Sequence, residues 1–175
     1  MPPSYSLLHH YLAALAYRTQ KALRGAPAEF GHFQAGHQVR TPIQLLCHMT
    51  NVLGYARTFF TGGSYRAEPL PTLEAEIRRF HEMLEDLSKH LKAGTSLQGT
   101  TPEKLLQGPF SDAMTHAGQL ATLRRLFGSP VPPENFIKAD IDAGNLGPDQ
   151  PDPVSPDEEW PETPPTAPPP VGSRQ

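Results

Sequence analysis

Apolar side chains recur every three or four residues along four stretches of this chain, which is the spacing of one helix face. The first stretch covers residues 4–24 and ends at Gly25 and Pro27. The third begins at Thr72, ends at Gly94 and separates its apolar residues with charged ones. This pattern predicts an amphipathic helix of about 20 residues in each of these two stretches.

The second and fourth stretches also carry start and stop signals. Thr41 can cap a helix that begins at Pro42, and Gln44 stands where it can complete a capping box. We expect this helix to run to Phe60, just before a glycine pair. After a short helical turn over residues 102–107, a fourth helix is expected over residues 109–127, with a glycine cap next in the chain.

Strand signals are absent from the sequence, because no alternating run of β-branched residues is bounded by turn residues. Four helices with one apolar stripe each can bury those stripes together in a bundle. The sequence therefore predicts an all-α fold, a four-helix bundle with an irregular proline-rich C-terminal extension. Connections of about 10 to 16 residues are long for bundle neighbours and leave room for a crossover topology.

Proline and charge are distributed unevenly along the chain. Residues 129–175 hold 13 of the 21 prolines and nine acidic against two basic residues, whereas residues 1–128 have a net charge of +4. Such a density of proline is incompatible with helix or central strand. We expect a bundle domain over residues 1–128, an extension over residues 129–148 able to pack on it, and a disordered acidic tail over residues 149–175.

Charge and cysteine usage bear on partners and compartment. The surplus of four positive charges is scattered and too small to indicate nucleic acid or a membrane surface as partner. No run approaches 18 apolar residues, and the N-terminus does not have the order of a secretory signal. The single cysteine, Cys47, fits a reducing compartment. We therefore expect a cytoplasmic protein.

Two polar residues interrupt the apolar stripe of the fourth helix. Asp112 and His116 are four residues apart and share a face with Leu120 and Leu123. An unpaired buried carboxylate costs several kcal/mol, so Asp112 requires an arginine, a histidine, a solvent-filled pocket or a metal ion. Such a pair can hold one metal ion, or form a hydrogen bond near the helix start without any metal.

His48 lies at one margin of the apolar stripe of the second helix. It is about 9 Å from the start of that helix, and Asp112 and His116 average about 7.5 Å from theirs. Parallel helices with level starts would bring the three side chains together, whereas antiparallel helices would separate them. A metal site of these three residues therefore predicts that the second and fourth helices run parallel.

The segments LLCHM around His48 and DAMTHAGQLATLRR over residues 112–125 resemble paired signatures of the DinB/YfiT-like helical bundle proteins, over roughly residues 7–127. In that family a histidine on the second helix and an HxxxH pair on the fourth bind a divalent metal. Here Asp112 stands where the first histidine of the pair usually is. The resemblance thus implies a site of two histidines and one carboxylate, His48, Asp112 and His116, for zinc, nickel, manganese or iron.

The resemblance also implies chemistry, a small-molecule substrate and a homodimer. Characterised family members activate a low-molecular-weight thiol for transfer to an electrophile or for isomerisation, and hydrolysis is suggested for many relatives. An open coordination position can lower the pKa of a bound thiol or water. We therefore expect a metal-dependent S-transferase or hydrolase. The alternative is a metal-free helical binding or stress-associated module of the same fold.

Several other polar residues have interpretations of their own. Gln119 could hydrogen-bond a ligand, and His37 lies in a loop that could cover the mouth of the site. Cys47 is expected to be a small, partly buried residue rather than a nucleophile. Arg124 suits an ion pair with a carboxylate of the bundle. The remaining helix histidines are expected at the surface or its boundary, at positions 9, 10, 81 and 90.

Overall fold

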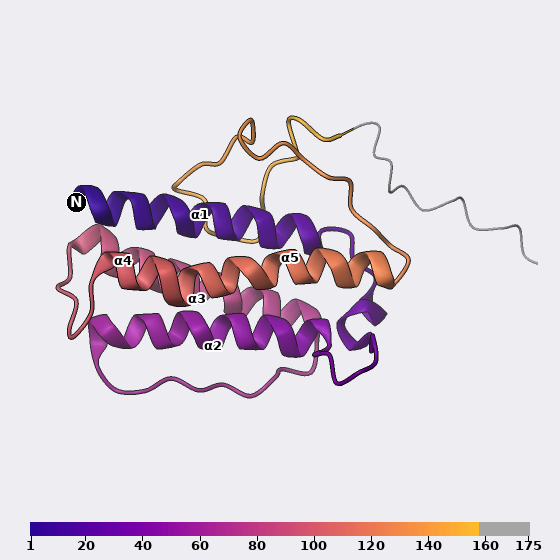
Figure 1. The fold of residues 1–175 in the computed structure, drawn as a ribbon, viewed down its shortest axis with the longest axis horizontal. Helices are drawn as coiled ribbons and strands as arrows, with labels where there is room; N and C mark the ends of the chain where they lie inside the picture. The colour runs from indigo at the N-terminus through magenta and orange to yellow at the C-terminus, as the bar shows by residue number, and fades with distance from the viewer. Residues whose placement is uncertain (158–175) are drawn as a thin grey trace, which may run out of the picture. The chain divides into compact units, whose positions relative to one another are not determined.

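The helix ends fall close to the start and stop signals of the sequence. The computed structural model describes residues 1–157, and the part of the predicted disordered tail over residues 158–175 lies outside them. The described residues form helices and no strand, which confirms the all-α prediction (Figure 1). The helical elements, in chain order, are α1 (Pro3–Leu23), η1 (Ala28–His32), α2 (Pro42–Thr61), α3 (Leu73–Ala93), α4 (Pro102–Leu105), η2 (Leu106–Phe110) and α5 (Ser111–Leu126).

The predicted capping box is present at the start of α2. The backbone N–H of Gln44 donates to the Thr41 hydroxyl at 3.4 Å, and the Gln44 side-chain carbonyl accepts from the Thr41 N–H at 3.0 Å. Both contacts satisfy backbone donors that the first helical turn leaves free. The cap fixes where α2 begins, and with it the position of His48 along the bundle.

The segment before α5 departs from the prediction of a helix that starts at Pro109. Pro109 lies inside η2, a single π-helical turn, next to Gly108 with φ −95° and ψ −105°. Proline has no N–H to continue the helical ladder, so the backbone bulges before regular hydrogen bonding resumes at Ser111. The bulge lies one turn before Asp112.

The four long helices form a bundle in which α1 packs beside α3 and α5, and α2 packs beside the same two helices. In Figure 1 the colours show that α2 and α3 run in one direction and α1 and α5 in the other. The parallel pair α2 and α3 requires a return segment along the bundle, residues 62–72. The four-helix bundle is confirmed, and its topology includes the crossover that the long connections allowed.

The return segment is held closely against α2. The Asn51 side chain forms both hydrogen bonds of a strand-like pair with Ala67, donating to its carbonyl at 2.9 Å and accepting from its N–H at 2.7 Å. The Tyr65 ring lies directly over Gly54, where a Cβ would come within 2.1 Å of the ring. Only glycine at position 54 permits this approach.

Apolar residues from all four long helices fill the interior, among them Leu12, Leu46, Leu84 and Leu120, each with no exposed surface. Full burial of a leucine side chain stabilises a fold by roughly 1.5–3 kcal/mol. Cys47 is more fully buried than expected, and its thiol donates to the Ala67 carbonyl. The fold therefore depends on the predicted apolar stripes. No helix within residues 1–157 is both long and apolar enough to span a membrane.

The C-terminal extension divides between two compact units. Residues 141–151 belong to the same unit as residues 1–131, and the second unit contains residues 132–140 and 152–157 of the described chain. Leu146 is buried in the first unit, and its carbonyl accepts a hydrogen bond from His81 Nδ1 at 2.6 Å. In the second unit the Asn135 N–H donates to the Ser155 carbonyl at 3.2 Å. The expected boundary at residue 148 thus falls inside the first unit.

Three polar residues differ from expectation. His9 and His81 are buried rather than at the surface, His9 against the Ser88 hydroxyl at 2.9 Å and His81 against Leu146. Arg124 is also buried, and it donates at 3.1 Å to the carbonyls of Ala22 and Arg24 instead of pairing with a carboxylate. The end of α1 needs donors for its last carbonyl groups, and Arg124 supplies them.

Candidate metal centre

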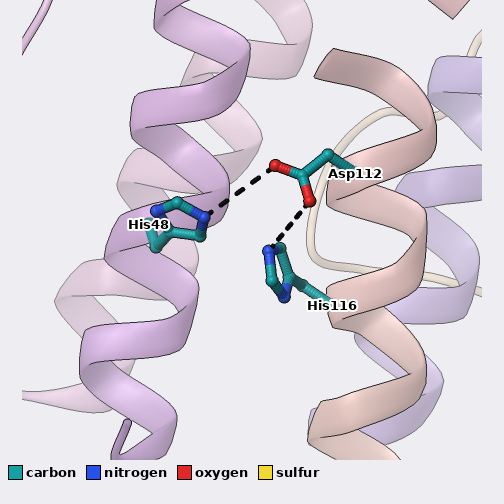
Figure 2. Close-up of side chains that lie close together, drawn as sticks. All are labelled: His48, Asp112 and His116. Atoms are coloured by element: carbon teal, nitrogen blue, oxygen red, sulfur yellow. Dashed lines mark ion pairs between the residues drawn. The ribbon is translucent and has the colours of Figure 1, made fainter. Parts of the chain in front are cut away.

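His48 from α2 and Asp112 and His116 from α5 point toward one another in the bundle (Figure 2). The His116 Nε2 is 3.2 Å from Asp112 Oδ1, and His48 Nε2 is 3.9 Å from Asp112 Oδ2. One ligand atom from each of the three residues lies within 4.8 Å of the other two. The structure thus brings together all three residues that the sequence proposed as metal ligands.

The prediction that the two helices run parallel is wrong, because α2 and α5 are antiparallel neighbours (Figure 1). His48 lies beside Asp112, and Tyr55, two turns further along α2, lines a hollow together with Gln107, which precedes Asp112 in the chain. The side chains still meet because the helix ends are not level. The last turn of α5 extends past the start of α2, so that Leu126 lies beside the loop that precedes α2.

Asp112 is not buried on the apolar stripe, which corrects a second premise. Its side chain is 48% exposed, at the edge of the bundle in the first turn of α5. Solvent and the positive end of the helix dipole both stabilise a carboxylate there. Asp112 therefore does not require a metal ion to neutralise its charge. The evidence for a metal site must come from the two histidines.

His116 provides that case, because its side chain is only 10% exposed and its two ring nitrogens are in different situations. Its Nδ1 is 2.7 Å from the side-chain carbonyl oxygen of Gln119. A carbonyl oxygen only accepts hydrogen bonds, so Nδ1 carries the proton and Nε2 is left with a lone pair. The Nε2 is buried and, within residues 1–157, has no partner with hydrogen-bond geometry.

The nearest charged atom to that lone pair is the Asp112 carboxylate oxygen at 3.2 Å. Two acceptors at this distance repel unless a cation lies between them or a proton is taken up by Nε2. The His48 ring adds a third donor atom from the opposite helix, with ring centroids 4.8 Å apart. The arrangement fits a cation bound by two imidazoles and one carboxylate, or an ion pair between Asp112 and a protonated His116.

The surroundings of His48 favour its neutral form. Desolvation lowers the pKa of His48, the positive charge of Arg40 and the neighbouring His116 lower it further, and Asp112 acts in the opposite direction. A histidine must be neutral to donate its lone pair to a metal ion. Burial of His48 therefore meets this condition, whereas the positive charge of Arg40 opposes a bound metal ion as it opposes a bound proton.

An open hollow of about 760 Å³ adjoins His48 and Asp112 between α2 and the η2–α5 segment. Gln119 hydrogen-bonds His116, and its predicted contact with a ligand stays a prediction. His37 is exposed in the loop before α2, with φ 51°, and is not one of the described residues that line the hollow. Gly108 and Pro109 of the π-helical bulge also line the hollow. The bulge was not predicted from the sequence, although the adjacent Gly-Pro pair was a signal for it.

Comparisons with known proteins found no match to this chain among family models, curated proteins or solved structures. The DinB/YfiT-like resemblance accordingly stays a prediction based on two short motifs.

Proposed function

We propose that the protein is a divalent-metal-dependent enzyme of the DinB/YfiT-like kind, which activates a small thiol or water for transfer or hydrolysis. The observation that carries this proposal is the buried Nε2 of His116. Its lone pair faces a carboxylate and a second imidazole, while Gln119 holds the proton on the other ring nitrogen. Metal-binding histidines commonly have their second nitrogen fixed in this way.

The separations between donor atoms support the same proposal. Ligand atoms 2.0–2.2 Å from a zinc ion are about 2.8–3.6 Å apart at octahedral or tetrahedral angles. The 3.2 Å contact between Asp112 Oδ1 and His116 lies in this range, whereas the 3.9 Å contact between Asp112 Oδ2 and His48 is longer. Two imidazoles and one carboxylate suit zinc, nickel, manganese and iron(II), so the donor set alone favours no single one of them.

The bound ion would supply a coordination position that lowers the pKa of a thiol or water. Gln119 orients the ring of His116, and Asp112 offsets part of the positive charge from the exposed side. The hollow beside His48 and Asp112 gives a small-molecule substrate access to that position. The homodimer and the cytoplasmic location that we expect from the sequence belong to the same proposal.

The second candidate is a metal-free helical binding or stress-associated module. It is favoured by the 3.2 Å contact between Asp112 and His116, which a proton on Nε2 would also explain. In that case Asp112 and His116 form an ion pair, His48 lies beside them, and no chemistry follows from the three side chains.

Metal content separates the two candidates. The full chain should be purified without a metal-binding tag, analysed by elemental mass spectrometry and then titrated with zinc after chelation. We expect about one divalent ion per chain and its uptake by the chelated protein. His37→Ala is the matched control, because it removes a histidine outside the site and should leave the stoichiometry unchanged. Negligible metal as purified together with failure to load zinc would favour the metal-free module.

A further inference from the structure

The wall of the hollow beside the candidate metal centre has few charged groups. Among the described residues that line it, His48, Asp112 and Tyr55 are ionisable, and none is a lysine or arginine. Arg40 is near His48 and lines two other hollows, one of which shares His48, but not Asp112, with the hollow described here. Carboxylates and phosphates are usually recognised by arginine or lysine side chains. A substrate body with negative groups would find no such partner here and would lie close to Asp112.

Among the neutral polar side chains of the hollow, all but that of Gln107 are engaged with the backbone. Asn51 uses both ends of its amide on Ala67. The Ser111 hydroxyl donates to the Leu106 carbonyl at 2.6 Å, and the Thr115 hydroxyl donates to the Ser111 carbonyl at 2.9 Å. These groups therefore offer few free donors to a ligand, and the hollow does not have the composition of a site for sugars or other strongly polar molecules.

Apolar groups make up the rest of the wall. Val52 and Tyr55 follow His48 on the same face of α2, and Pro109 faces them from η2. The Tyr55 side chain is 56% exposed, although its ring is supported by Phe59 with centroids 4.9 Å apart. A supported but exposed aromatic ring beside a proline offers a flat apolar surface to a ligand.

We propose that the substrate of this site is an uncharged small molecule with an apolar, preferably aromatic, body and a single group that binds the metal. This inference rests on the proposed metal-dependent function. An ion of charge +2 beside one carboxylate and two neutral imidazoles leaves a net charge of +1, which one thiolate or comparable donor neutralises. Thiols that carry several carboxylates are then poor substrates, because nothing in the hollow compensates their additional charges.

Three hydroxamates test the inference, because they share one metal-binding head and differ in the body. The probes are benzohydroxamate, acetohydroxamate and 4-carboxybenzohydroxamate, each titrated into the zinc-loaded full chain and monitored by backbone amide NMR shifts. We expect benzohydroxamate to bind about tenfold more tightly than acetohydroxamate, the equivalent of about 1.4 kcal/mol. The carboxylated probe should lose most of that gain.

The same titrations on chelated protein distinguish failure of this inference from failure of the proposed function. Without metal every probe should bind more weakly, but benzohydroxamate should still bind best and shift the amides of Val52, Tyr55 and Thr115. Failure to load zinc would overturn the metal-dependent function, whereas the metal-free titrations would still test the hollow. Equal affinity of benzohydroxamate and either other probe, or shifts elsewhere on the chain, would overturn the inference.

A charge introduced on the wall sharpens the test. Val52→Lys should increase affinity for the carboxylated probe several-fold and weaken benzohydroxamate, since lysine can cover the apolar wall and hold a cation at its rim. Leu7→Lys is the matched control, because it places the same charge at an exposed apolar position on α1. Unchanged probe preference in Val52→Lys, with zinc affinity intact, would contradict the proposed location of the substrate body.

Discussion

His81 and His116 are both buried, and each has Nδ1 fixed by an oxygen acceptor and Nε2 without a hydrogen-bond partner in residues 1–157. Their surroundings differ. The His81 ring lies among apolar groups, with the Phe80 ring edge-on at 5.2 Å, and burial lowers its pKa to about 4. The Nε2 of His116 instead faces a carboxylate oxygen and a second histidine. An unpartnered nitrogen therefore indicates a ligand site only where other donor atoms converge on it.

Removing one imidazole from each region should show most clearly that the two buried histidines have different roles. His116→Ala or His48→Ala should lower zinc affinity by more than about a hundredfold, because each deletes one of three ligands. His81→Ala should leave zinc affinity within about threefold while lowering stability by roughly 1–3 kcal/mol, since it opens a cavity and frees the Leu146 carbonyl. Calorimetric zinc titration and urea unfolding measure the two quantities. Equal zinc affinity in all the variants would contradict the site.

The pH dependence of stability should identify His81 as the histidine that folding keeps neutral. Its folded pKa of about 4 is below its ordinary value of 6.5, so the unfolded chain binds a proton that the folded chain does not. The contribution of neutral His81 to the free energy of unfolding is therefore complete above pH 6.5. It is lost as the pH falls toward 4, by about 3 kcal/mol in total.

Urea unfolding at several pH values between 7 and 4 tests this. His9 and His48 also have lowered pKa values, so the test is the difference between the native chain and His81→Leu. In the variant, the unfolding free energy should decline less between pH 7 and pH 4, and the difference from the native chain should be nearly the whole of the about 3 kcal/mol. Identical slopes would mean that folding does not lower the pKa of His81.

The hydrogen bond from His116 to Gln119 should have a smaller effect. Gln119→Leu removes the acceptor that keeps the proton on Nδ1, and zinc affinity should fall by about tenfold. Gln119→Glu retains an acceptor oxygen and should bind zinc within a few-fold of the native chain. Thr122→Leu is the matched control, one turn further along the exposed side of α5. Equal affinity in all three variants would show that Gln119 does not position the ring.

The sequence predicted the helices well because local signals determine them. Thr41, Pro42 and Gln44 specify the start of α2 without any other part of the fold. The relation between α2 and α5 was predicted wrongly, because it depends on the crossover of residues 62–72 and on how far α5 extends past α2. Burial of Asp112 was also misjudged, because helical spacing locates a residue on a face but does not show how far that face extends into solvent.

The exposure of Asp112 leads to the smallest expected effect. A carboxylate that is 48% exposed contributes little through pairing, so Asp112→Asn should change the stability of the metal-free chain by less than about 0.5 kcal/mol. The same variant should weaken zinc binding, because a neutral amide replaces a charged ligand, whereas Asp112→His should retain the metal and favour softer or borderline ions. Chemical unfolding of chelated protein and zinc titration measure both. If Asp112→Asn instead costs more than about 1 kcal/mol without metal and leaves the metal content unchanged, Asp112 is an ion-pair partner of protonated His116, and the three-ligand site is wrong.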